Sequence, residues 1–222
     1  MNALFQLLGS IATGIVLWIV LFAVFFAAIM LLIMGAVKVF SRHAPQQPAA
    51  TIPPVPFDYS RLPTLAALIT SNDETAVADI QLLVHDSAAF AAKYADWLAE
   101  LDFKPDWCDL ITAYFLTGYD TPYKYGTYID WKEEPAEIIH GLQAAATHLG
   151  YVLPFDEFEF DNGIFTDVAL RALRVFLLTK GYSLVTWDTE SDCYHLFIVP
   201  FEKHDELVKL GQSMGIRFLT NF

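Results

Sequence analysis

A long uncharged apolar run near the amino terminus most constrains what this chain can form. Residues 3–37 contain no ionisable side chain, and nearly every residue of 11–34 is apolar. A helix needs about 20 such residues to cross the hydrocarbon core of a bilayer. The sequence therefore predicts one transmembrane helix over residues 11–34, within an anchor segment of residues 1–40.

The flanks of this run favour a retained anchor over a cleaved signal peptide. No Lys or Arg precedes the run, whereas a signal peptide starts with positive charge and carries an apolar stretch of about 7–15 residues. Lys38 and Arg42 follow it directly, and basic flanks stay on the cytoplasmic side. We therefore expect a single-pass protein of the inner cell membrane with its carboxy-terminal domain in the cytoplasm.

A proline-rich segment follows the anchor. Prolines at positions 45, 48, 53, 54 and 56 favour extended polyproline II backbone, which acts as a semi-rigid spacer. Residues 41–60 are thus predicted to be a tether, and residues 61–222 a single domain.

The charge of the domain limits its partners. The chain has a net charge of −13, and residues 1–50 contribute only Lys38 and Arg42 to it, so the negative charge belongs to the later residues. An acidic surface repels phosphate backbones, which argues against nucleic-acid binding, and it attracts basic proteins. We therefore expect a basic protein partner.

Periodicity predicts an α+β domain, rich in helices and ending in a small, mostly antiparallel sheet. The apolar spacing predicts a helix over 165–180 that is buried on most sides. Ser71 and Glu74 fit a capping box. The tail is predicted to run strand, strand, helix, strand, with a hairpin at its start. Helices are expected at 61–71, from the capping box at 71–74 through 84, and at 87–101, 105–117, 135–149, 165–180 and 203–214, and strands at 182–189, 193–200 and 216–222.

Two clusters of aromatic and acidic residues, at 119–131 and 156–161, together with the predicted hairpin, are candidates for a binding surface. Tyr and Trp combine apolar area with a hydrogen-bonding end and concentrate at contact surfaces. The same residues also cap the core of helical domains, and both interpretations stay open. The candidate binding residues are Tyr119, Tyr123, Tyr125, Tyr128, Trp131, Asp156, Glu157, Glu159, Trp187, Asp188 and Asp192.

Cys193 and His195, with Asp188, are the main catalytic candidates, while Glu133, Glu134 and Glu137 at a helix start are more typical of a solvated face than of an acid/base pair. Cys193 and His195 lie two residues apart on a predicted strand, hence on one face, with Asp188 and Asp192 near the same turn. A nucleophilic Cys–His–Asp site, or a metal site from these four residues, is geometrically conceivable. The chain has no phosphate-binding loop and no catalytic motif of a known hydrolase, so we expect no cofactor.

Two segments carry a resemblance to a known family. Residues 128–135 (YIDWKEEP) and 187–200 (WDTESDCYHLFIVP) resemble a bacterial domain family of unknown function, over about residues 62–219. The resemblance implies an α+β fold and assigns no catalytic residue. Small acidic bacterial domains often serve as immunity or partner-binding modules, which is an analogy between folds.

Three functions follow as hypotheses. The leading one is a membrane-anchored, non-catalytic protein-binding module, with toxin neutralisation as one version of it. The second is a membrane-tethered hydrolase that uses Cys193 and His195. The third is a structural subunit of a membrane complex, in which residues 11–34 carry the specificity.

Overall fold

The computed structural model describes residues 57–159 and 164–219. The expected transmembrane helix and most of the expected tether lie outside these residues. Within the described part of the chain, no helix is both long and apolar enough to cross a bilayer.

Four antiparallel strands form the central sheet, in the order β1-β3-β2-β4. The predicted hairpin is confirmed: Tyr182 pairs with Pro200, and Trp187 pairs with His195. The short β4 pairs with β2, while the edge strand β1 pairs with β3 and was missed by the sequence analysis. The strands are β1 (Gly126–Asp130), β2 (Tyr182–Asp188), β3 (Cys193–Pro200) and β4 (Arg217–Leu219).

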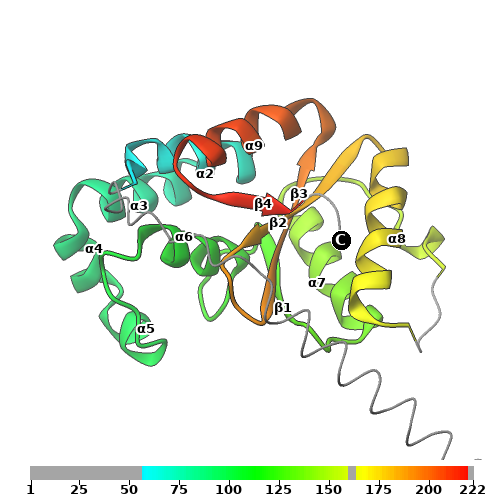
Figure 1. Cartoon of the computed structure of the whole chain (residues 1–222), viewed down its shortest axis with the longest axis horizontal. Coiled ribbons are helices and arrows are strands. Elements are labelled where there is room, and N and C mark those ends of the chain that lie inside the picture. The colour runs from blue at the N-terminus through cyan, green and yellow to red at the C-terminus, as the bar shows by residue number, and fades with distance from the viewer. Residues whose placement is uncertain (1–56, 160–163, 220–222) are drawn as a thin grey trace, which may run out of the picture. The chain divides into compact units, whose positions relative to one another are not determined.

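Helices cover both faces of this sheet, as Figure 1 shows. The α+β class is therefore confirmed for the described domain. The α-helices are α2 (Leu62–Ile69), α3 (Glu74–His85), α4 (Ser87–Lys93), α5 (Ala95–Glu100), α6 (Cys108–Thr117), α7 (Pro135–His148), α8 (Thr166–Thr179) and α9 (His204–Ser213). Short 3-10 turns occupy Tyr59–Arg61, Phe155–Glu157 and Phe201–Lys203.

The alternation of side chains along β3 divides the core in two. Phe197 and Val199 join the cluster built with helices α2, α3, α6 and α9. Leu196 and Ile198 join the cluster built with α7 and α8 on the other face. Successive side chains of a strand point to opposite faces, so one strand anchors both helical layers.

Three predicted helix boundaries were wrong. Asp73, not Ser71, caps α3, and its carboxylate accepts bonds from the amides of Thr75 and Ala76. Ser71 has φ of 53°, a left-handed conformation outside any helix. The predicted helix 87–101 breaks at Tyr94 into α4 and α5. The helix predicted from residue 105 begins three residues later, as α6.

Helix α8 has the predicted extent but not the predicted burial. Ala169, Leu170, Leu173 and Leu177 face the sheet and are fully buried. The opposite side is open to solvent, and Val175 there is 63% exposed. The strongly apolar composition predicts burial on most sides, whereas the fold covers only one.

The end of α6 depends on a glycine, and this gives the first prediction. Gly118 has φ of +79°, and a Cβ there would lie 2.0 Å from the carbonyl oxygen of Tyr123. Gly150 has a similar φ of +74°, but a Cβ there meets nothing within 4 Å. Replacing either with Ala costs about 1–2 kcal/mol for the left-handed backbone.

Gly118→Ala is therefore expected to lower the free energy of unfolding by about 1–3 kcal/mol more than Gly150→Ala, because only it adds a steric clash. Urea unfolding of the two variants, followed by circular dichroism, measures the difference. Equal losses would contradict the close approach at Gly118.

Candidate functional site

Cys193 and His195 are in contact. Both side chains leave the same face of β3, and the Cys193 sulfur lies 3.5 Å from Nε2 of His195. The hydroxyl of Ser191 lies 2.9 Å from the same sulfur. Residues two apart on a strand share a face, so the predicted strand correctly placed Cys193 and His195 side by side.

His195 is enclosed by aromatic rings. The ring of Tyr114 lies 4.4 Å from it and that of Tyr128 lies 5.4 Å away, centroid to centroid. The hydroxyl of Thr117 lies 3.4 Å from Nδ1. Burial lowers the pKa of His195 to about 3, so the ring is neutral at physiological pH and holds a proton poorly. A general base needs a pKa near the working pH, and burial moves the pKa of His195 far below that value.

The predicted acid does not join the pair. The Asp188 carboxylate bonds to Arg217 at 2.6 Å and accepts from the amide of Glu190 at 3.0 Å. Asp188 therefore does not complete a Cys–His–Asp site, because it is engaged by Arg217 of the neighbouring β4. In the described ranges, no group of three or more His, Cys, Asp or Glu side chains is arranged to hold a metal ion.

Most of the predicted aromatic surface is core. Tyr123, Tyr125 and Trp187 are buried, so these three cannot form a binding surface. Trp187 packs against the ring of Phe218 at 5.3 Å. Tyr119 is partly buried, with its ring 4.7 Å from that of Tyr128. Of the two interpretations left open, core capping holds for this group.

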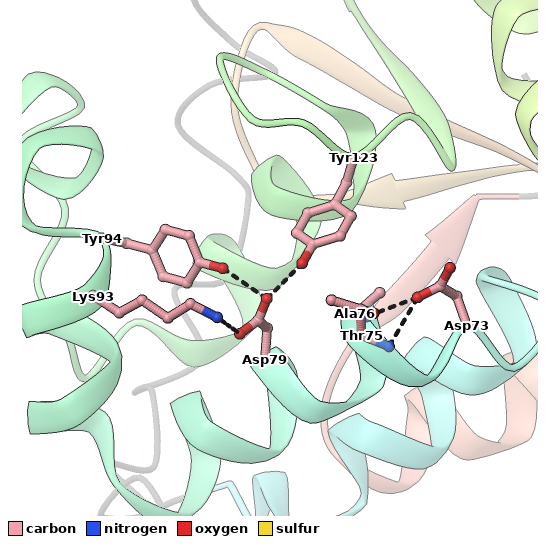
Figure 2. Close-up of polar contacts among 7 residues, drawn as sticks. All are labelled: Asp73, Thr75, Ala76, Asp79, Lys93, Tyr94 and Tyr123. Carbon is pink, nitrogen blue, oxygen red and sulfur yellow. Dashed lines mark hydrogen bonds and ion pairs between the residues drawn. The ribbon is translucent and has the colours of Figure 1, made fainter.

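The hydroxyl of Tyr123 is bonded to a buried carboxylate, that of Asp79, as Figure 2 shows. Asp79 is 3% exposed and lies on the buried face of α3. Tyr123 and Tyr94 donate to it at 2.5 and 2.6 Å, and Lys93 forms an ion pair with it at 2.5 Å. Burial raises the pKa of Asp79, but the bonds from Lys93 and the two tyrosines outweigh burial and hold the pKa below its usual value.

Sequence reasoning missed Asp79, although a signal was present. Ala76, Ile80 and Leu83 form the buried stripe of α3, and Asp79 falls inside that stripe. A carboxylate at such a position is rarely buried without partners, so the stripe itself indicates a polar network.

The remaining candidates are exposed. Trp131 is 52% exposed at the end of β1, and Asp156, Glu157 and Glu159 are exposed after α7. Glu157 forms an ion pair with Lys180 at 2.6 Å. Asp192 is exposed at the hairpin turn.

Trp131 lines an open pocket of about 600 Å³ where β1 ends and where α7 and α8 begin. Phe165, 82% exposed, and Tyr194 supply further aromatic surface, and neither was a sequence candidate. The Lys132 ammonium lies 4.3 Å from the Trp131 ring centre. The lining residues are Trp131, Lys132, Glu133, Glu134, Pro135, Ile164, Phe165, Thr166, Asp167 and Tyr194.

The walls of this pocket combine apolar rings with negative charge. Glu133, Glu134 and Asp167 supply carboxylates and Lys132 supplies a cation, while the Asp167 carboxylate is already paired with Arg171 on α8. The first turn of α8 is fixed against the start of α7 because Thr166 donates to the carbonyl of Glu133 at 3.1 Å. Apolar walls with a few carboxylates suit a basic side chain with an aliphatic stem, such as Lys or Arg.

A comparison with known families bears on the whole domain. The family described as a domain of unknown function (DUF6630) matches residues 61–221. The chain belongs to this family. The match confirms the expectation of an uncharacterised domain family and spans both segments that carried the resemblance. No curated protein and no solved structure matches the chain.

Asp79 gives a prediction for the DUF6630 domain. Asp79→Asn removes the buried charge that accepts from Tyr94 and Tyr123 and pairs with the half-exposed Lys93, and is expected to cost about 1.5–3 kcal/mol of unfolding free energy at pH 7. Asp96→Asn, on the exposed side of α5, is the matched control and should change stability by less than about 0.5 kcal/mol.

The stability that Asp79 contributes to the fold should depend on pH. Because the folded pKa of Asp79 is lowered, its contribution is present above the unfolded pKa of about 3.9 and is lost as pH falls through the folded pKa. Urea unfolding between pH 7 and pH 3 should show the difference between wild type and Asp79→Asn narrowing below about pH 4. A constant difference would contradict a charged Asp79.

Proposed function

We propose that this chain is a membrane-anchored protein-binding module without catalysis, and that its domain binds a basic protein partner. The apolar run 11–34 supplies the anchor in this proposal, and the domain faces the cytoplasm. Neutralisation of a basic toxin is one specific form of it, since opposite charge accelerates encounter.

The observation that carries the proposal is the open pocket beside Trp131. An aromatic ring left half exposed at a pocket rim is a typical interface anchor. Glu133 and Glu134, which outnumber Lys132 in the lining, favour a cationic group there over an anionic one. The net charge of −13 acts in the same direction over a longer range.

The scaffold supports binding because it positions the pocket rigidly. Pro135 is buried at the first turn of α7, and Thr166 is buried at the first turn of α8. Both helices pack on the sheet through fully buried side chains such as Ile138 and Leu170. A pocket held in this way needs little ordering on binding, which preserves affinity.

The test uses a defined probe, a fluorescent peptide of alternating Arg and Leu, and its Glu–Leu counterpart. The full chain should bind the Arg peptide more tightly, and added salt should weaken binding because exposed charges are screened. Trp131→Ala should weaken binding about tenfold, the loss of a typical hot-spot side chain. Fluorescence anisotropy measures both effects.

Matched controls make this test specific. Trp107→Ala removes another exposed Trp, in the loop before α6, and should leave binding unchanged. Glu134→Gln should weaken binding, whereas Glu100→Gln, exposed on α5, should not. Equal binding of the Arg and Glu peptides, or equal effects of the two Trp variants, would overturn the proposal.

A thiol hydrolase is the second candidate, favoured by the 3.5 Å contact between Cys193 and His195. The neutral, enclosed His195 and the engagement of Asp188 with Arg217 weigh against it. If a screen of ester substrates finds turnover, Cys193→Ala should abolish it. Turnover that survives this substitution would remove the site from consideration.

The structural-subunit proposal differs in where specificity resides. Exchanging residues 11–34 for an unrelated spanning helix should leave peptide binding intact if the domain is the binder. Loss of binding on that exchange would favour the structural subunit instead.

A further inference from the structure

A cation already lies on the exposed ring of Trp131, and it belongs to the protein itself. The ammonium of Lys132 is 4.3 Å from the centre of that ring, inside the roughly 6 Å over which an aromatic face attracts a cation. Trp131 is 52% exposed, so the contact is made in the open pocket and not in the core. The ring face is therefore a cation site that the free protein fills with its own side chain.

The turn after β1 positions Lys132 beside this ring. The Asp130 carboxylate accepts a hydrogen bond from the backbone amide of Lys132 at 2.9 Å, and the Asp130 carbonyl accepts one from the amide of Glu133 at 3.0 Å. These two bonds fix the backbone around Lys132. Its side chain is exposed and has a flexible four-carbon stem, so it can leave the ring without disturbing the fold. A cation that enters the pocket thus competes with Lys132 for Trp131.

This competition decides which cation gains from the ring. A partner's lysine replaces one ammonium on Trp131 by another, so the contact that it gains equals the contact that Lys132 loses. A guanidinium is planar, stacks on aromatic faces and is more weakly hydrated than an ammonium, so it gains more from the ring than Lys132 loses. Its planar fork also offers N–H donors to the carboxylates of Glu133 and Glu134, which line the same pocket.

We propose that the pocket beside Trp131 takes an arginine side chain of the partner, and that Lys132 is a built-in competitor that denies the ring to lysine. The inference rests on the proposed function and names the group that the pocket recognises. When arginine enters, Lys132 leaves Trp131 and its ammonium returns to solvent. When lysine enters, the ring gives no net gain, and only charge and apolar contacts elsewhere in the pocket hold it.

Two fluorescent peptides of matched design, alternating Arg–Leu and alternating Lys–Leu, test the selection on the full chain by fluorescence anisotropy. The wild-type chain should bind the Arg peptide about fivefold more tightly, the size of one cation–π contact at an exposed site. Trp131→Ala should weaken binding of the Arg peptide about tenfold, as a hot-spot side chain does. It should weaken binding of the Lys peptide only about twofold, because lysine gains nothing from the ring while Lys132 is present.

Lys132→Gln opens the ring to both peptides, and a double-mutant comparison separates this effect from the loss of a positive charge. In the Lys132→Gln background, Trp131→Ala should weaken binding of the Lys peptide about fivefold instead of about twofold. Both members of that comparison lack the charge, so its effect cancels. Lys104→Gln is the matched control, because Lys104 is also exposed and lies over another ring, that of Trp107, at 5.4 Å. In that background the loss caused by Trp131→Ala should stay at about twofold.

The outcomes separate the arginine selection from the proposed function. If neither peptide binds, the protein-binding function fails and the selection fails with it. If both bind but the Lys peptide depends on Trp131 equally with and without Lys132, only the competition by Lys132 is overturned. Equal affinity of the wild-type chain for the two peptides would overturn the selection of arginine and leave a pocket that takes any cation.

Discussion

The structure depends on the burial of β3 from both sides. Its alternate side chains, Phe197 and Val199 on one face and Leu196 and Ile198 on the other, supply both hydrophobic clusters. Each of these four side chains is fully buried, and each contributes about 1.5–3 kcal/mol of apolar transfer free energy. Strands β1 and β2 both pair with β3, so the whole sheet takes its register from it.

This arrangement also decides which candidate site is usable. Position 195 falls on the same buried face of β3 as Phe197 and Val199, so His195 is enclosed and neutral although it touches Cys193. Trp131 follows the last residue of the edge strand β1, where coverage ends and the first turns of α7 and α8 leave an open pocket. The enclosed position of His195 disfavours chemistry that needs water or a substrate. The open pocket beside Trp131 favours contact with a partner.

Local signals in the sequence predicted local structure well. The hairpin was predictable because β-branched and aromatic residues alternate on both sides of its polar turn, and the contact of Cys193 with His195 followed from that period. Gly118 and Gly150 marked helix ends because each adopts a left-handed backbone. Strand β1 escaped notice because five residues, with Tyr128 among turn formers, give too short a pattern to recognise.

Features that depend on distant residues were not predictable. Tyr123 is buried because its hydroxyl donates to Asp79, 44 positions away along the chain. A tyrosine is also common on exposed contact surfaces, so its residue type alone does not predict burial. The break at Tyr94 accompanies its hydroxyl bond to the same carboxylate, which no local propensity encodes. The pocket was missed for the same reason, because Trp131 and Phe165 come together only through the packing of α7 and α8.

Hydrogen–deuterium exchange of the full chain, with and without the basic peptide, tests the central claim that this domain binds a cationic partner at the pocket on a rigid scaffold. The account predicts slower exchange on binding in residues 131–135 and 164–167, with β3 equally protected in both samples. Slower exchange centred on residues 193–195, or no change near Trp131, would contradict it.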